Sequence, residues 1–232
     1  MRDIRLFFSL VWAICREDFR IPLFTLIVLF GAVWSLLHGE PVCAQDRIPA
    51  QAEQYHRVLV RAAHAEWGLS APIATFAAQV HQESRWRADA RSPVGAQGLA
   101  QFMPTTSEWI AGLYPAALGA NQPYNPGWAL RALVAYDRYL YARNQAISEC
   151  HRWGFVLAAY NGGQGWVNRD RRLASASGAD QLAWFDGVER FNAGRSISAF
   201  RENRNYPRLI LLRYERLYSE WGDGVCAERY VL

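Results

Sequence analysis

Apolar residues recur at intervals of three and four positions along most of the chain, which is the period of an α-helix that buries one face. The clearest stripe belongs to a segment that starts near Gln51 and ends at Gly68. The residues on its apolar face are Tyr55, Val58, Leu59 and Ala62. We therefore expect a helix between Gln51 and Gly68.

The same pattern predicts five further helices. Two are expected to begin near Ser70, which could cap the first turn, and near Pro104. The others are expected over residues 126–143, 149–160 and 206–221. Residues 165–205 are the least periodic stretch, and we expect irregular structure there. Because no sustained alternation of apolar and polar residues suggests strands, the pattern predicts an all-α fold in one domain.

A hydrophobic segment precedes these helices. Residues 21–37 carry no charge over 17 positions, and several arginines lie before them. This length falls between a spanning helix of roughly 20 residues and the shorter core of a secretory signal. Small residues at Val42 and Ala44 fit a cut before Gln45. Residues 1–44 are therefore predicted to be a signal peptide or an anchor in the inner membrane, which places residues 45–232 outside the cytoplasm, in the periplasm.

Composition and charge indicate which classes of binding partner to expect. The formal net charge is +4, and all 25 basic residues are arginine. This charge suits an anionic polymer or a membrane surface. No basic run with interleaved aromatics appears, so nucleic acid is not an expected partner, and membrane contact is expected only through the N-terminal segment. Histidines lack the spacing of a metal motif, and no glycine-rich phosphate loop follows a strand, so we expect neither metal nor cofactor.

Of the four cysteines, only Cys150 and Cys226 would survive a cut after Ala44. In an oxidising compartment they could form one disulfide. Two unpaired buried thiols fit the sequence equally well, because their separation in space is unknown.

Glu83 is the first residue that suggests chemistry. It continues the apolar stripe of its helix, so its side chain should point toward the interior. The stripe is formed by Ile73, Phe76 and Val80. A carboxyl there should keep its proton at neutral pH, as a general acid must. Spacing alone nevertheless favours a more ordinary alternative, an ion pair with an arginine that follows within four residues.

Three ordered segments carry a family resemblance: HQESRWRADARSPVGAQGLAQFMPTT at 81–106, AAYNGG at 158–163 and ENRNYPRLI at 202–210. Together they resemble the soluble lytic transglycosylase (SLT) domain family, whose fold is similar to goose-type lysozyme. The resemblance spans about residues 50–221. It implies a single lysozyme-like helical domain, within residues 45–232, that cuts the glycan strands of peptidoglycan.

The resemblance implies that Glu83 is the catalytic acid and base. The other matched positions are expected to bind or orient the substrate: Ser84, Ser92, Gln101, Met103, Tyr160, Asn161 and Tyr206. Among them, the serine after Glu83 is expected mainly to fix local structure. Ala100 departs from the family's usual methionine, which affects the fit of a sugar rather than the reaction. Two alternatives stay open, since Tyr160 could be a core residue and Asn161 could only help to end a helix.

The resemblance also implies a reaction that uses one carboxyl. No second carboxylate lies in the three segments at a position that could be assigned, and Asp89 is interpreted as a loop residue. Most glycosidases use two carboxylates, so the substrate must supply the missing group. Glu83 would protonate the oxygen that leaves C1 of N-acetylmuramic acid, supported by the sugar's 2-acetamido group. It would then take the proton of the C6 hydroxyl, which closes a 1,6-anhydro ring.

Two rival functions remain at this point: a lysozyme-like hydrolase that uses water, and a catalytically silent wall-binding scaffold. The sequence does not decide between endo and exo cleavage. A small exported domain of this kind also suits a secretion or conjugation apparatus that must open the wall, and such machinery is a second expected partner beside the glycan strands.

Overall fold

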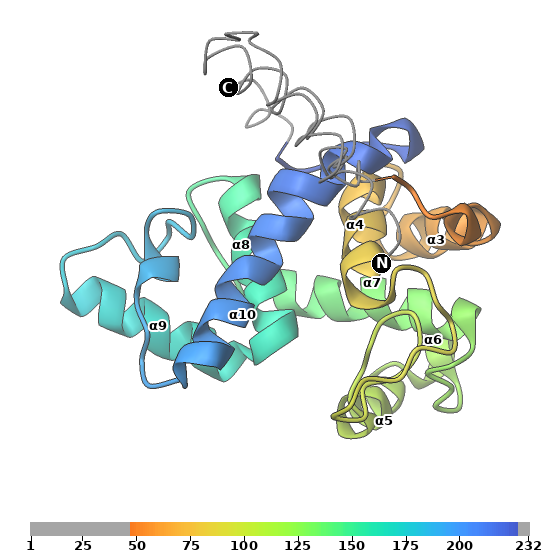
Figure 1. Cartoon of the computed structure of the whole chain (residues 1–232), viewed down its shortest axis with the longest axis horizontal. Helices are drawn as coiled ribbons and strands as arrows, with labels where there is room; N and C mark the ends of the chain where they lie inside the picture. Colours follow the sequence, from red (N-terminus) through yellow and green to blue (C-terminus); the bar gives the residue numbers. More distant parts are fainter. Residues whose placement is uncertain (1–46, 227–232) are drawn as a thin grey trace, which may run out of the picture. The chain divides into compact units, whose positions relative to one another are not determined.

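The computed structural model describes residues 47–226, and the predicted export segment at 1–44 lies outside them. Within residues 47–226 the fold is all-α, as the sequence predicted (Figure 1). The only pairings of the strand type in this part are two isolated bridges, Arg91 with Gln97 and Gln97 with Phe102. None of the helices in the described part is long and apolar enough to cross a membrane.

The longest connections between consecutive helices are the loop between α4 and α5 and the loop between α9 and η2. Their bounds are η1 Ala50–Ala52, α3 Glu53–Trp67, α4 Ile73–Ser84, α5 Pro104–Leu113, α6 Pro115–Leu118, α7 Pro126–Tyr141, α8 Glu149–Gly162, α9 Gln164–Ala176, η2 Val188–Arg190, α10 Ile197–Leu209, η3 Ile210–Tyr214 and η4 Glu215–Trp221.

The ends of several helices follow from local chemistry. Proline starts α5 and α7, where its missing N–H costs nothing. The side chain of Asn125 caps α7 by accepting from the N–H of Trp128, and Ser148 caps α8 in the same way. The expected cap at Ser70 is wrong. Pro72 occupies the N-cap position of α4, and no side chain bonds to that helix end.

The expectation of irregular structure at 165–205 is wrong in part, because α9 and much of α10 lie there. The buried face of α9 has only Val167, Asp170 and Ala174, and one of them is charged. A stripe this narrow gives little hydrophobic periodicity, so the helix could not be recognised from apolar spacing.

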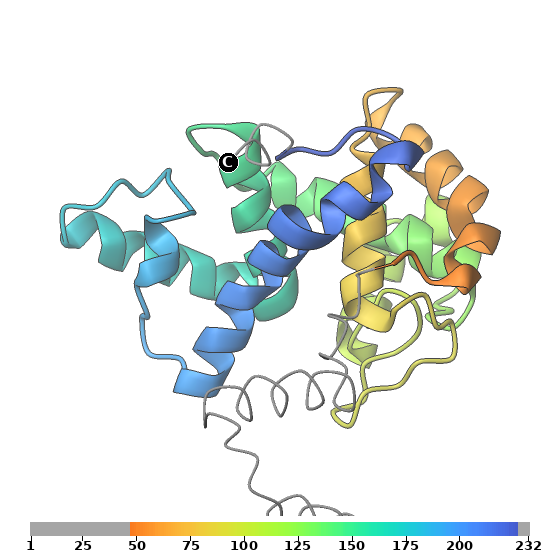
Figure 2. The same cartoon turned by 45° about the horizontal axis from the view of Figure 1, so that its top comes forward.

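The predicted helix at 206–221 is longer and less regular than expected. It begins at Ile197, contains Pro207, widens to a π-helix at Ile210–Tyr214 and tightens to a 3₁₀-helix at Glu215–Trp221. Proline lacks the N–H of the helical ladder, which disturbs regular winding. In Figure 2 this blue segment runs diagonally from α10 past α8 to the upper end of α4.

Two helices form the centre of the domain. Ten positions of α4 and nine of α8 are buried, so both helices are covered on most sides. Close packing is strict at Gly154 on α8, where a Cβ would lie 2.3 Å from Cδ1 of Trp184. Because α4 is buried along its length and ends at Ser84, it carries Glu83 from the core to the domain surface.

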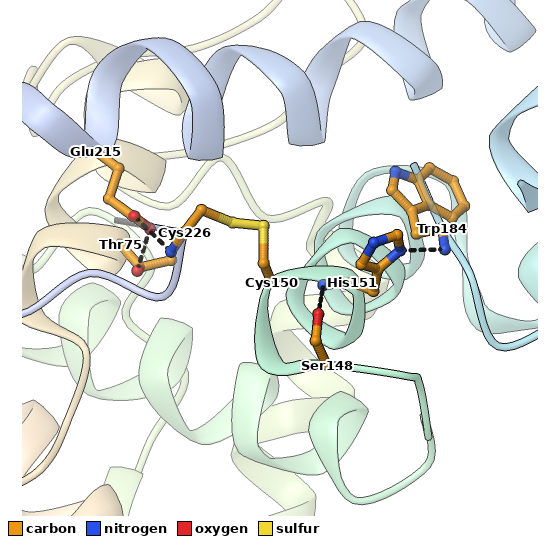
Figure 3. The surroundings of a disulfide bond; sticks show 7 residues. All are labelled: Thr75, Ser148, Cys150, His151, Trp184, Glu215 and Cys226. Carbon is orange, nitrogen blue, oxygen red and sulfur yellow. Dashed lines mark hydrogen bonds between the residues drawn. A yellow bond between two sulfur atoms is a disulfide. The ribbon is translucent and has the colours of Figure 1, made fainter. Parts of the chain in front are cut away.

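Cys150 and Cys226 form a disulfide, so the pairing that the sequence left open is present in the structure (Figure 3). It joins the start of α8 to the segment that follows η4. The carboxylate of Glu215 supports this junction, since it accepts from the backbone N–H of Cys226 at 2.9 Å and from the hydroxyl of Thr75 at 2.6 Å.

Candidate active site

Glu83 lies in the last turn of α4, where the chain leaves the core. The two residues that follow the end of α4, Arg85 and Trp86, have positive φ angles of 50° and 64°, so the backbone turns sharply away. Neither Arg85 nor Arg87 is within ion-pair distance of Glu83, and the ion pairs of residues 47–226 all lie elsewhere. The simpler explanation of Glu83, a salt bridge to a following arginine, is therefore not what the structure contains.

The carboxyl of Glu83 is set up as an acid. The side chain is half-buried, and its pKa is raised to about 8, mainly because burial removes the hydration of the charged form. This value includes two smaller effects: a hydrogen bond from the hydroxyl of Tyr206 to Oε1 of Glu83, which lowers the pKa, and the charge of Glu202, which raises it. Burial is the largest of these effects, so Glu83 carries its proton at neutral pH.

Two tyrosines from different helices stand beside this carboxyl. Tyr206 of α10 is 5% exposed, and its ring stacks on that of Tyr160 of α8 with centroids 6.4 Å apart. The hydroxyl of Tyr160 donates to the carbonyl of Ala100 at 2.8 Å. Burial, followed by the charge of Glu83, raises both tyrosine pKa values well above their usual range. Both hydroxyls therefore stay protonated and act as donors.

Gln101 lies in the loop between α4 and α5, directly after Ala100, whose carbonyl accepts from Tyr160. Gln101 has a φ of 47°, and its amide nitrogen donates to the carbonyls of Gly98 at 2.9 Å and Ala90 at 3.2 Å. Gly98 is required here, because its φ is 70° and a Cβ would lie 1.9 Å from the carbonyl oxygen of Pro123. The loop is thus held in one shape by backbone constraints and by the amide of Gln101.

The remaining predicted residues differ in their access to solvent. Met103 is 41% exposed at the start of α5, where it is free to contact a ligand. The hydroxyl of Ser92 accepts from the N–H of Ala96 at 2.9 Å and so closes a turn in the same loop. Ser84 is 2% exposed and bonds to the carbonyl of Val80, which fits a role in local structure rather than contact with a sugar.

Asn161 belongs to a second group of polar residues, at the C-terminal end of α8 and in the middle of α10. Its amide oxygen accepts from Asn203 at 3.0 Å, and its nitrogen donates to Glu202 at 3.4 Å. These three residues line a cavity of about 310 Å³. Its other lining residues are Gly162, Trp166, Gly194, Arg195, Ser196 and Ala199.

The sequence of residues 59–183 matches the Transglycosylase SLT domain family. The chain belongs to this family.

The relatives that match this chain are longer. Membrane-bound lytic murein transglycosylase F from Vibrio parahaemolyticus is 30% identical over 180 residues, which are 77% of this chain and 28% of that protein. The structure of the 70-kDa soluble lytic transglycosylase from Escherichia coli has 25% identity and a TM-score of 0.52, and covers 74% of this chain and 25% of that one. The structure of an inactive glutamate-to-glutamine mutant of lytic transglycosylase Slt from Pseudomonas aeruginosa has 26% identity and a TM-score of 0.57. The match covers 82% of this chain and 28% of that one.

The chain therefore spans about a quarter of the length of the relatives it matches. The family resemblance and the lysozyme-like helical fold inferred from the three sequence segments are both confirmed. Among residues 47–226, no group of three or more His, Cys, Asp or Glu side chains could hold a metal ion.

Three polar residues of this SLT domain were missed by the sequence analysis. Glu202 and Asn203 stand in the segment that carried the resemblance, so a signal was present but no role was assigned. Asp137 had no signal, because it lies in a helix predicted for its apolar face. The structure buries it completely, behind the site, with its Oδ1 accepting from the amide of Gln79 at 3.4 Å.

Proposed function

We propose that this protein is a peptidoglycan lytic transglycosylase that cleaves the β-1,4 bond between N-acetylmuramic acid and N-acetylglucosamine without water. The observation that carries the proposal is the half-buried carboxyl of Glu83, whose pKa is about 8 and which accepts a hydrogen bond from Tyr206. Membership of the SLT family and the names of the relatives, lytic murein transglycosylases, point to the same substrate.

In the first step, Glu83 gives its proton to the glycosidic oxygen as the bond to C1 of N-acetylmuramic acid breaks. The 2-acetamido group of the same sugar supports the positive charge that develops at C1. The leaving sugar departs with the proton, and Glu83 becomes a carboxylate. The Tyr206 hydroxyl stabilises this anion, because a hydrogen bond to a charged acceptor is stronger than one to a neutral acceptor.

In the second step, the C6 hydroxyl of N-acetylmuramic acid gives its proton to Glu83, and its oxygen bonds to C1. The product carries a 1,6-anhydro ring, and Glu83 is protonated again. A pKa of about 8 suits both steps, since the group is protonated at neutral pH and is still a useful base once ionised.

Glu202 provides one observation in favour of a second candidate, a lysozyme-like hydrolase. It is exposed, and its charge is felt by Glu83, so it could activate a water molecule. Its hydrogen bond to Asn161 gives it another role, which is to hold the wall of the cavity. We favour transglycosylation, and the products of the two reactions differ by one water.

The test is digestion of purified wall sacculi by the intact protein, with mass analysis of the soluble fragments. We expect 1,6-anhydro ends from the wild type and from Glu202→Gln, and no fragments from Glu83→Gln. Reducing ends from the wild type, lost in Glu202→Gln, would identify the hydrolase instead. Fragment release that survives Glu83→Gln would overturn both candidates, because both need that carboxyl. No release from the wild type would leave the wall-binding scaffold.

We further propose that the protein works in the periplasm, delivered or anchored by residues 1–44, and that a secretion or conjugation apparatus is its partner. Support for the location comes from the uncharged segment at 21–37 and from the description of the relatives as membrane-bound. Cell fractionation with and without residues 1–44 tests the location. Recovery of the full chain in the cytoplasm would contradict it.

A further inference from the structure

We propose that Gln79 and an un-ionised Asp137 form a positioning pair behind Glu83, joined edge to edge by two hydrogen bonds. The pair would hold α4 against α7 and keep the floor of the site free of charge. This inference rests on the proposed function of Glu83, because the pair acts through that residue and does not itself reach a substrate.

The first observation is a set of unpaired atoms. Gln79 and Asp137 are both 0% exposed, and the amide nitrogen of Gln79 lies 3.4 Å from Oδ1 of Asp137. In the described part of the chain, the other two oxygens, Oε1 of Gln79 and Oδ2 of Asp137, have no hydrogen-bond partner. Buried polar atoms without partners are rare and costly, so this arrangement needs an explanation.

One proton on Asp137 would give both unpaired oxygens a hydrogen-bond partner. A carboxylic acid and a primary amide can meet through two parallel hydrogen bonds, N–H to one carboxyl oxygen and O–H to the amide oxygen. The contact from Gln79 to Oδ1 is the first of these bonds. A proton on Oδ2 would supply the second, to Oε1 of Gln79. An ionised Asp137 could not, because it has no hydrogen to donate.

The surroundings of Asp137 also favour the neutral form. Burial, and then the charge of Glu83 on α4, raise its pKa well above the usual range, while the bond from Gln79 lowers it. Tyr160 of α8, Tyr206 of α10 and Tyr136 on its own helix feel the charge of Asp137. The groups that act on the pKa of Asp137 include no cation.

The charged groups of the other helices that pack on α7 do not favour the ionised form of Asp137. Glu66 of α3 interacts with Arg138 and Tyr114, and Glu108 of α5 is exposed. An ionised Asp137 would therefore be a buried charge without compensation, facing the carboxyl of Glu83.

The pair connects to the site along α4. Gln79 precedes Glu83 by four residues, so both side chains leave the same side of the helix one turn apart. Tyr136, next to Asp137, packs on Tyr160 with ring centroids 5.3 Å apart, and Tyr160 packs on Tyr206. Fixing Gln79 to Asp137 thus fixes Glu83 opposite its donor. A neutral pair also leaves Glu83 as the only group nearby that becomes an anion when its proton is transferred.

Two variants separate positioning from simple stability. Asp137→Asn keeps an edge-to-edge amide pair without a titratable proton, and we expect kcat within about twofold of the wild type. Gln79→Leu with Asp137→Leu replaces both partners by apolar groups, so the melting temperature should stay near that of the wild type. In this double variant we expect kcat to fall by about tenfold with KM unchanged, because a misplaced acid slows the chemical step.

The pH profile provides a readout that a purely structural pair would not change. Loss of two polar groups below Glu83 should raise its pKa further, moving the activity profile of the double variant to higher pH. A double variant with wild-type kcat and profile would show that the pair only fills the core. A large loss of kcat in Asp137→Asn would show that Asp137 does not act as a neutral acid.

A measurement without turnover keeps this proposal separate from the proposed function. The infrared spectrum of the intact wild-type protein at neutral pH should contain the C=O band of a buried carboxylic acid that disappears in Asp137→Asn. Absence of that band overturns the pair even if the enzyme cuts the wall. Presence of the band in a protein that releases no fragments would instead overturn the proposed function and with it the role of the pair in catalysis.

Discussion

At the scale of single residues, the site joins side chains that are far apart in the sequence. The carboxyl of Glu83 and the hydroxyl of Tyr206 meet although 123 positions separate them. The sequence could predict both residues because each stands in a segment that resembles a known family. It could not predict Asp137 or the Glu202 charge that reaches Glu83, because their roles depend on how α7 and α10 approach α4.

The hydrogen bond from Tyr206 gives the first prediction at this scale. Activity that needs protonated Glu83 should fall as the pH rises through its pKa of about 8. Tyr206→Phe removes a bond that lowers this pKa, so the alkaline limb of kcat/KM should move up by about one pH unit and kcat should fall. Tyr160→Phe is the matched control, since its hydroxyl bonds to Ala100 instead. An alkaline limb that stays in place in Tyr206→Phe would contradict this role.

Asp137 gives a second prediction, about stability. In the unfolded chain an aspartate ionises above about pH 4, whereas burial keeps Asp137 protonated in the folded protein, because its pKa is raised. Its contribution to stability is therefore complete below that pH and is lost as the pH rises toward the folded pKa. The asparagine of the Asp137→Asn variant does not titrate. The free energy of unfolding of this variant should therefore rise relative to that of the wild type by up to about 1.4 kcal/mol per pH unit as the pH increases.

Urea unfolding of both proteins between about pH 5 and pH 8 measures this difference directly. Asp89→Asn, on an exposed loop, controls for the loss of an acidic side chain. A difference between Asp137→Asn and wild type that does not change with pH would exclude a protonated Asp137.

At the scale of helices, the success of the sequence analysis depended on the width of the apolar face. The helices α4, α7 and α8 were predicted within a few residues because each buries nine or more positions. The narrow face of α9 and the four-residue α6 gave no usable period. Changes of winding after Pro207 could not be predicted, since they depend on what the helix packs against.

Packing of α8 leads to a third prediction. Gly154→Ala would place a methyl group 2.3 Å from the ring of Trp184, so we expect a loss of about 1–3 kcal/mol in the free energy of unfolding. Gly165→Ala is the matched control, because it lies in α9 with nothing within 4 Å of the added carbon. It should stabilise the protein by about 0.5–1 kcal/mol through higher helix propensity. Equal effects of the two substitutions would show that Trp184 can move aside.

At the scale of the whole described domain, the disulfide closes a loop of 76 residues that contains α9, α10 and both irregular helices. Sequence alone left this link open, since the distance between two cysteines is set by the packed fold. The link ties the long C-terminal helical segment, which carries Tyr206, back to the central helix α8.

The final prediction concerns this link. Reduction should lower the free energy of unfolding by about 4 kcal/mol, as expected for a loop of this length. Thermal melts with and without a reductant measure the effect. The double variant Cys150→Ser with Cys226→Ser should have the melting temperature of the reduced wild type, and a reductant should not change it. A reductant-sensitive melt in that double variant would point to another target.

The same link bears on when the proposed activity can develop. A chain that is still in a reducing compartment lacks the covalent tie between α8 and the residues around Cys226, so its least regular helices are held by noncovalent contacts alone. Such a chain is easier to keep unfolded for transport and slower to assemble the donor opposite Glu83. For the function and the periplasmic location proposed above, oxidation would then act as a timing step, because the domain would gain its covalent tie only after export.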